Sequence, residues 1–132
     1  LKQTRHHTPI YAVEPNEFDD TKRSLASGQL EIVDSKARSI CDSLLAPTPG
    51  EKTFSINKQL LSGGLSVSDE EALQAMAIAF KDLKLVVEPG GAVALAAALS
   101  EKISVKDKTT VVVVSGGNVD DTTFRRALDY CC

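Results

Sequence analysis

A serine followed by two glycines ends an apolar run, an arrangement that is typical of a ligand-binding turn. The run is TTVVVV, and Ser115, Gly116 and Gly117 follow it. Glycines carry no Cβ, so the backbone can turn sharply there and approach a ligand closely. In open α/β sheets, ligands bind just past the carboxyl ends of strands, where loops meet helix amino termini. Ser115 is therefore a candidate binding residue, although an ordinary strand-to-helix turn explains the same three residues about equally well.

Three carboxylates gather between an apolar segment and a helix. They are Glu14, Asp19 and Asp20. Asp19 and Asp20 could cap the helix and complement its dipole. The same oxygens, together with backbone carbonyls, could instead bind a hard cation. From the spacing alone, capping is the favoured interpretation.

A second glycine pair follows Glu88, in the stretch EPGGA. Glu88 stands between the apolar segment LKLVV and the alanine-rich helix predicted for AVALAAALSEK. We expect its carboxylate to be partly buried and to need a partner. Its position suits a helix N-terminal acid and a functional group equally well.

The elements that position these residues predict an α/β fold. The valines of Thr109–Asp120 are β-branched without polar alternation, which predicts a strand buried on both faces, as in the middle of a parallel sheet. Two shorter strands are predicted at PIYAV and LSVSD. Helices are predicted before and after them, in the ranges 21–28, 53–62, 69–83, 92–102 and 121–130.

Local signals fix the ends of two of these helices. Gly28 is a C-cap for the first helix. Ser68 and Glu71 have the spacing of a capping box for the helix 69–83. On that helix Leu73, Met76, Ala77 and Phe80 share one face, which predicts core packing. Residues 29–52 are rich in turn formers, and a loop of this length is often functional.

Composition limits the classes of protein. The chain has 132 residues, which fits one domain or part of one. Its 15 basic and 18 acidic residues give a net charge of -3, which argues against a nucleic-acid or anionic-membrane partner. No apolar run approaches the ~18 residues of a membrane span, and these residues contain no signal-peptide pattern. We therefore expect a cytoplasmic protein without a membrane partner.

The cysteines and histidines suggest no site. Cys41, Cys131 and Cys132 have neither a disulfide framework nor zinc-ligand spacing, which favours a reducing compartment. His6 and His7 lie in LKQTRHHTP, which is typical of the tail of a helix whose start lies upstream. Neighbours on a helix point in different directions, so these histidines are assigned no role.

Three motifs stand in order along the chain, and together they resemble a known family. They are AVEPNEFDD, LVVEPGGAVALAA and VVVVSGGNVD. They are similar to the carboxyl-terminal half of the pyridoxal-phosphate enzymes of fold type II, in the group of serine/threonine dehydratases and serine racemase. The resemblance covers nearly the whole chain. It implies a three-layer α/β fold with an open, mostly parallel sheet and helices on both faces. Residues 1–132 would form the carboxyl-terminal part of that catalytic domain, and no separate regulatory domain is expected among them.

The resemblance assigns cofactor contacts to four residues. Ser115 matches the residue that hydrogen-bonds the pyridine nitrogen, and Gly116 continues its loop. Glu88 matches a glutamate near the ring, and Ser43 falls where a loop backbone passes the cofactor. A neutral hydroxyl on the ring nitrogen makes the ring a moderated electron sink, which suits the elimination of a β-hydroxyl.

The resemblance also reverses the interpretation of the carboxylate cluster. Glu14, the carbonyl of Phe18 and Asp20 match a cation site found in part of this group. Two carboxylates and one carbonyl, completed by water, suit Mg²⁺ or Ca²⁺. Zinc is disfavoured because no sulfur or imidazole ligand is offered.

The implied activity is dehydration of L-threonine or L-serine to a 2-oxo acid and ammonia. Serine racemase, a dehydratase of hydroxyaspartate or another β-hydroxy amino acid, and a non-catalytic binding remnant are the alternatives. The family's Schiff-base lysine and glycine-rich phosphate loop have no counterpart here, so no catalytic residue is assigned within these residues. We therefore expect a partner, the amino-terminal half of the enzyme in the same or a separate chain, and a homo-oligomeric assembly.

Overall fold

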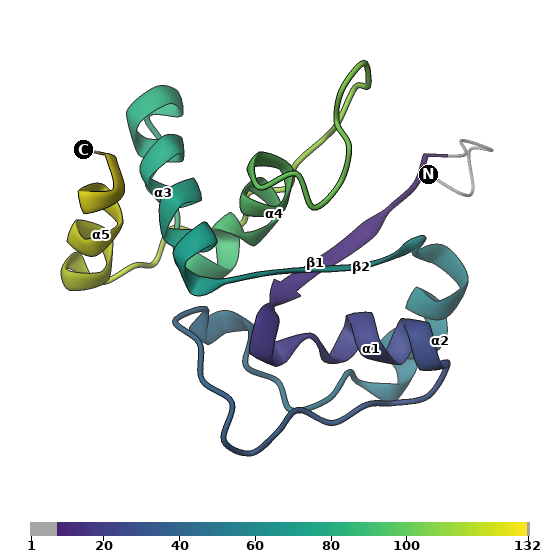
Figure 1. The fold of residues 1–132 in the computed structure, drawn as a ribbon. Coiled ribbons are helices and arrows are strands. Elements are labelled where there is room, and N and C mark those ends of the chain that lie inside the picture. Colours follow the sequence, from purple (N-terminus) through teal and green to yellow (C-terminus); the bar gives the residue numbers. More distant parts are fainter. Residues whose placement is uncertain (1–7, 132) are drawn as a thin grey trace.

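Two parallel strands lie at the centre of the fold (Figure 1). The computed structural model describes residues 8–131, so residues 1–7 of the predicted helix tail, with His6 and His7, lie outside the described residues, as does Cys132. Strand β1 (Tyr11–Pro15) pairs with β2 (Gly63–Val67), with Val13 opposite Leu65. Both strands coincide with predicted strand segments to within two residues. The α/β class and the parallel pairing are confirmed.

Helices cover both faces of this strand pair. Helices α1 (Asp20–Ser27) and α2 (Glu51–Leu60) lie on one side, and α3 (Asp69–Leu83) and α4 (Pro89–Leu99) lie on the other (Figure 1). Side chains alternate across a strand. Leu65 accordingly packs against the hydrophobic core, whereas Ser66 accepts a hydrogen bond from Lys22 Nζ of α1.

Helix α1 ends at the predicted glycine. Gly28 adopts a left-handed backbone with φ of 77°, and its N–H donates to the carbonyl of Ser24. This conformation costs glycine little because it has no Cβ. The prediction of a C-cap is confirmed.

Helix α3 matches its predicted range. Ser68 accepts a hydrogen bond from the Glu71 N–H, and the Glu71 carboxylate accepts one from the Ser68 N–H, which completes the capping box. Leu73 and Met76 are fully buried. Phe80 is 39% exposed, so its assignment to the core face was only partly right. Its ring instead lies edge-on to Phe124 of α5 (Asp121–Leu128), with the centroids 5.3 Å apart.

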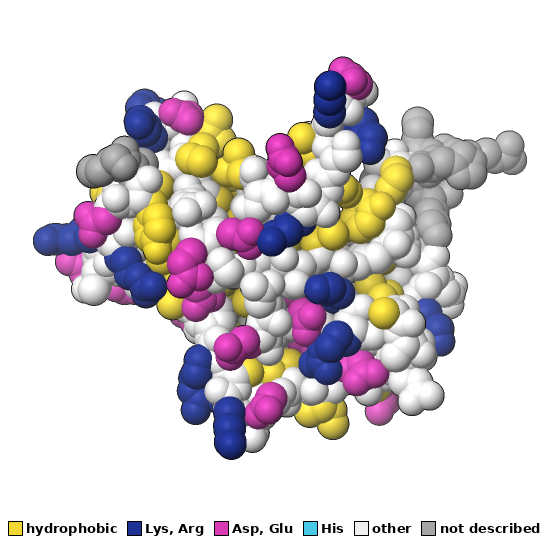
Figure 2. Space-filling model, in the orientation of Figure 1, with side chains coloured by type: hydrophobic (Ala, Val, Ile, Leu, Met, Phe, Trp, Pro, Cys, Tyr) yellow, Lys and Arg dark blue, Asp and Glu magenta, His cyan; other side chains and the backbone are white. Residues whose placement is uncertain are grey.

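The valine run differs from its prediction. Residues 109–120 belong to no strand of the described chain, and Val111 and Val113 are 85% and 71% exposed. Val114 alone among the four valines packs against the core. A strand requires a neighbour to accept its backbone hydrogen bonds, and residues 8–131 supply none on this side. Figure 2 shows hydrophobic side chains reaching the surface of the upper part of the molecule, where α3 and α4 lie.

The connection between α1 and α2 is irregular, as predicted. It contains one short 3-10 helix, Asp42–Leu44, and two more such turns occur at Asn16–Phe18 and Asp129–Cys131. Cys41 is a free thiol with no exposed surface. None of the helices within residues 8–131 is long and apolar enough to span a bilayer.

Candidate functional site

The two glycine-containing loops pack directly on each other. Gly91 is buried in the first turn of α4, and a Cβ added there would overlap the carbonyl oxygen of Ser115. The main chain of Ser115 therefore approaches α4 as closely as a backbone allows. The Ser115 residue itself is exposed. The Ser115 loop thus packs against α4 on one side and is exposed on the other.

Glu88 ties the same two loops together. Its carboxylate Oε2 accepts a hydrogen bond from the Asn118 N–H at 3.0 Å, and its own N–H donates to the Gly116 carbonyl at 3.3 Å. Gly116 has φ of 83°, and a Cβ there would lie 2.5 Å from Glu88 Oε1. The half-burial and the partner that the sequence predicted for Glu88 are confirmed. The role of the Asn118 amide was missed, since nothing local marks it.

Ser43 reaches this cluster from the long loop. A Cβ added at Gly90 would overlap Ser43 Oγ, so the hydroxyl fills the space that glycine leaves. Leu44, its neighbour, packs against the core. The structure therefore brings together Ser43, Glu88, Ser115 and Gly116, which are far apart in the sequence.

A cavity of about 320 Å³ opens beside this cluster. Its lining comes from the 40–42 loop, the start of α4 and the residues before and within α5: Ile40, Asp42, Pro89, Asn118, Val119, Asp120 and Thr123. Asp120 caps α5 by accepting from the Thr123 N–H at 2.9 Å. The cavity is a space next to the glycine loops, bounded mainly by polar groups.

The cluster is chemically suited to a planar ligand with a basic ring nitrogen. Ser115 offers a neutral hydroxyl at an exposed position, and Gly116 after it and Gly91 beneath it let the loop come close to α4. Glu88 is occupied with loop backbone, so it fixes the loop that carries Ser115. These donor and steric features fit pyridoxal phosphate at the ring end.

The carboxylate cluster at β1 is arranged differently from the predicted caps. Glu14, not Asp19 or Asp20, caps α1: its two oxygens accept from the N–H groups of Thr21 and Lys22 at 3.1 and 2.9 Å. Asp19 pairs instead with Lys22 and Arg23. Capping by Asp19 and Asp20 was wrong, because the neighbouring strand already delivers a carboxylate to the helix start.

Glu14 and Asp20 are nevertheless close enough for their charges to interact. Burial raises the pKa of Glu14, and the charge of Asp20 raises it further. Burial likewise raises the pKa of Asp20, which is 4% exposed. Among the described residues, no group of three or more His, Cys, Asp and Glu side chains is placed to hold a metal. Glu14, Asp20 and the Phe18 carbonyl would thus need water to complete a cation shell, and they fit a hard ion by donor type.

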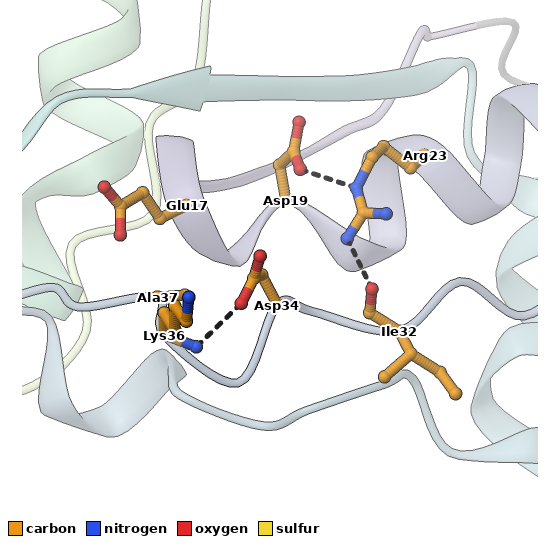
Figure 3. A pocket seen from close by; sticks show the side chains of 7 residues that line it. All are labelled: Glu17, Asp19, Arg23, Ile32, Asp34, Lys36 and Ala37. Carbon is orange, nitrogen blue, oxygen red and sulfur yellow. Dashed lines mark hydrogen bonds and ion pairs between the residues drawn. The ribbon is translucent and has the colours of Figure 1, made fainter.

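A second cavity, of about 520 Å³, lies on the outer side of α1 (Figure 3). Arg23 in its lining bonds to Asp19 at 2.8 Å and to the Ile32 backbone carbonyl at 3.1 Å, and Asp34 accepts from the Lys36 backbone N–H. None of the cofactor candidates lines it. We assign it no part in the site.

The fold and the cluster define an α/β protein in which two glycine-containing loops and Ser43 converge at the start of α4. The family model described as pyridoxal-phosphate dependent enzyme matches residues 1–116. The chain belongs to this family, the pyridoxal-phosphate-dependent enzymes of fold type II. The cofactor of the family is pyridoxal phosphate.

Its relatives have several activities. The chain is 35% identical to the serine racemase of Dictyostelium discoideum, over 97% of this chain and 40% of that protein. It is 36% identical to the beta-hydroxyaspartate dehydratase of Paracoccus denitrificans, over 86% of this chain and 35% of that protein. The solved threonine deaminase of T.th. superimposes with a TM-score of 0.79 at 38% identity, over 86% of this chain and 40% of that one. The chain thus spans about two fifths of the length of these proteins or less.

Proposed function

We propose that these residues form part of a pyridoxal-phosphate-dependent dehydratase that acts on L-threonine or L-serine. The observation that carries the proposal is the convergence of Ser43, Glu88 and Ser115 on two facing glycine loops. The solved threonine deaminase, at 38% identity, supports the choice of reaction. The products would be a 2-oxo acid and ammonia.

In this proposal Ser115 controls the electronic character of the ring. When bound, pyridoxal phosphate supplies an electron sink for the charge left at the substrate Cα. The Ser115 hydroxyl would hydrogen-bond the ring nitrogen without a formal charge. This weakens the sink and favours prompt loss of the β-hydroxyl over a long-lived carbanion.

The other residues of the cluster hold the ring in place. Glu88 keeps the Gly116–Asn118 backbone in one conformation through two hydrogen bonds. Gly90 and Gly91 let the Ser43 loop and the Ser115 loop come together over the first turn of α4. Small misplacements of reacting groups reduce the rate of a reaction, so a firmly positioned ring would favour activity.

A hard cation completes the proposed machinery. Glu14, Asp20 and the Phe18 carbonyl would hold Mg²⁺ or Ca²⁺ where β1 meets α1. Glu14 and Asp20 have raised pKa values through burial, and a bound cation would favour their ionised forms. Its contribution would be structural, since it would fasten the strand to the helix.

The lysine that binds the cofactor covalently and takes the α-proton would come from residues outside these 132. That part would be the amino-terminal half of the enzyme, in the same chain or a partner chain, and the whole would assemble as a homo-oligomer. In this division of labour the described residues hold and orient the ring, and the other half supplies the reacting base.

Serine racemisation is the alternative activity, and hydroxyaspartate dehydration is another. The relatives named for these activities are 35% and 36% identical to the chain, so each has comparable support from similarity. All three reactions begin with removal of the α-proton and use the same ring contacts. They differ in which group reacts next.

Borohydride reduction tests the proposal. The natively purified protein, with every polypeptide that co-purifies, would be reduced and analysed by peptide mass spectrometry. A pyridoxyl group on a lysine outside residues 1–132 is the expected result. Assays of 2-oxo acid, ammonia and D-serine formation from L-threonine, L-serine and hydroxyaspartate then separate the activities. A protein that carries no pyridoxyl group after reduction contradicts the proposal.

A further inference from the structure

Asp69 connects helix α3 to the loop that carries Ser43. Its Oδ1 accepts a hydrogen bond from Ser39 Oγ at 2.6 Å, and its Oδ2 accepts one from the Ile40 N–H at 3.1 Å. Ser39 Oγ in turn accepts from the Cys41 N–H at 3.1 Å. We infer that Asp69 is a positioning residue that fixes the Ser43 loop against the cofactor cluster. The inference rests on the proposed function.

Two other hydrogen bonds hold the loop at this point, from the Arg38 N–H to the Glu17 carboxylate at 2.7 Å and from the Asp42 N–H to the Ile40 carbonyl at 3.0 Å. Residues 29–50 contain only one turn of regular structure, Asp42–Leu44. Cys41 is fully buried, and its carbonyl accepts the Leu44 N–H at 2.8 Å. The Asp69 hydrogen bonds therefore act on the two residues just before this anchored turn. A shift there would be passed directly to Ser43.

Ser43 is sensitive to such a shift because it is in close contact with α4. Its hydroxyl occupies the space above Gly90, one residue before the glycine that supports Ser115. Asp69 itself is absent from the lining of the cavity beside the cluster and from the contacts of Glu88. It acts through Ser39 and Ile40, and not on a ligand.

Several contacts hold the end of α3 that carries Asp69. The capping box of Ser68 and Glu71 fixes its first turn, and Lys102 Nζ lies 2.8 Å from Glu71 Oε1. An aspartate in this turn is favoured by the helix dipole. Because both oxygens are charged acceptors, its hydrogen bonds to the loop are stronger than those of a neutral group. The helix therefore holds the loop in place.

The proposal predicts a specific effect of Asp69→Asn on cofactor binding. Asparagine keeps one acceptor oxygen and replaces the second with an amide NH2, which cannot accept, so the charge and one of the two acceptors for the loop are lost. We expect the Kd of the full-length protein for pyridoxal phosphate to rise roughly tenfold. Hydrogen exchange of the Cys41 and Leu44 amides should quicken in the same variant.

Two neighbouring substitutions are matched controls. Glu70→Gln removes a charge from the same helix turn at an exposed position. Glu71→Gln weakens the capping box without touching the loop. Glu70→Gln should change neither Kd nor exchange, and Glu71→Gln should lower the thermal unfolding midpoint without a comparable rise in Kd. Equal Kd values for Asp69→Asn and Glu70→Gln would overturn the inference, as would a rise in Glu71→Gln as large as that in Asp69→Asn.

A double-mutant cycle with Ser39→Ala isolates the pair. If Asp69 acts through Ser39, the rise in Kd of the double variant is smaller than the product of the two single effects. Independent effects would count against the proposed route. A wild-type protein that binds no pyridoxal phosphate would overturn the proposed function itself. A protein that binds it but is insensitive to Asp69→Asn would overturn only the positioning role.

Discussion

The Glu88 carboxylate accepts a hydrogen bond from the Asn118 N–H at 3.0 Å across 30 residues of sequence. The Glu88 N–H returns a hydrogen bond to the Gly116 carbonyl. These reciprocal contacts make the loop before α4 and the loop before α5 one unit. Any ligand held by Ser115 is therefore held by both loops.

Glu88→Ala should weaken this unit. The Asn118 N–H loses its acceptor, so the Ser115 loop gains freedom, and we expect the Kd of the full-length protein for pyridoxal phosphate to rise by about tenfold. Glu88→Gln keeps an acceptor oxygen and should show a smaller change. Glu51→Ala, in the exposed first turn of α2, is the control, and a Kd equal to that of Glu88→Ala would show that Glu88 has no special role.

Ser115→Ala should impair turnover without preventing covalent attachment of the cofactor. The lost hydrogen bond to the ring nitrogen would lower kcat by about tenfold or more, while borohydride reduction still labels the lysine. Steady-state kinetics and peptide mass analysis of the same sample make the comparison. Ser55→Ala, at an exposed position on α2, provides the baseline. Unchanged kcat in Ser115→Ala would remove the ring contact from the proposal.

Gly91→Ala should destabilise the fold around the two loops. The added Cβ would overlap the Ser115 carbonyl, which is backbone and cannot rotate away. Overpacking of this kind costs about 1–3 kcal/mol of unfolding free energy, measured by denaturant titration. At Gly50 the nearest atom to an added Cβ is Thr53 Oγ1 at 3.6 Å, so Gly50→Ala should cost less. Equal losses would mean that the close approach at Gly91 is easily relieved.

Asp20→Asn tests the cation. If Asp20 is a ligand, wild type should gain thermal stability on addition of Mg²⁺ or Ca²⁺, by about 2.7 kcal/mol at a hundredfold excess over Kd, and the variant should lose most of this gain. In chelator the two proteins should differ little. Asp82→Asn, at an exposed position on α3, should respond to the ions as wild type does. Equal ion-dependent gains in Asp20→Asn and wild type would leave Asp20 without a role in cation binding.

The pH dependence of stability should report on Glu71. Burial on its own would raise the pKa of this carboxyl, but the hydrogen bonds from Lys102 and Ser68 outweigh it, and the pKa falls below 4.5. An acid whose pKa is lower in the folded state than in the unfolded state stabilises the fold at pH values above the unfolded-state pKa. This contribution is lost as the pH falls through the folded-state pKa. The stability difference between wild type and Glu71→Gln should thus be largest near neutral pH and shrink below pH 4.5. A difference that does not vary with pH would contradict the charge-based account.

The features predicted well from sequence depend on neighbouring residues. The capping box of Ser68 and Glu71 and the Gly28 C-cap are both local patterns, and both are present. The start of α1 was not predictable in this way. Its cap comes from Glu14 on the preceding strand, which reaches the Thr21 and Lys22 amides only because β1 and α1 pack together.

In the candidate site, too, the local features were predictable from sequence and the tertiary contacts were not. The glycine pairs marked both loops, but their contact, with Gly91 under Ser115 and Gly90 under Ser43, is a product of tertiary packing. The valine run was predicted from its composition to be buried. Composition shows that the segment is suited to a buried strand, but a strand also needs a neighbouring strand. Residues 8–131 provide no such neighbour for the valine run.

The exposed valines also affect how these residues behave at high concentration. Val111 and Val113 are exposed in a segment that pairs with no strand of the described chain, next to two threonines of high β propensity. Such a segment is a template for strand addition and a nucleus for cross-β aggregation. A polypeptide of these 132 residues alone should therefore precipitate at lower concentration than one in which a charged residue, as in Val113→Lys, interrupts the apolar run.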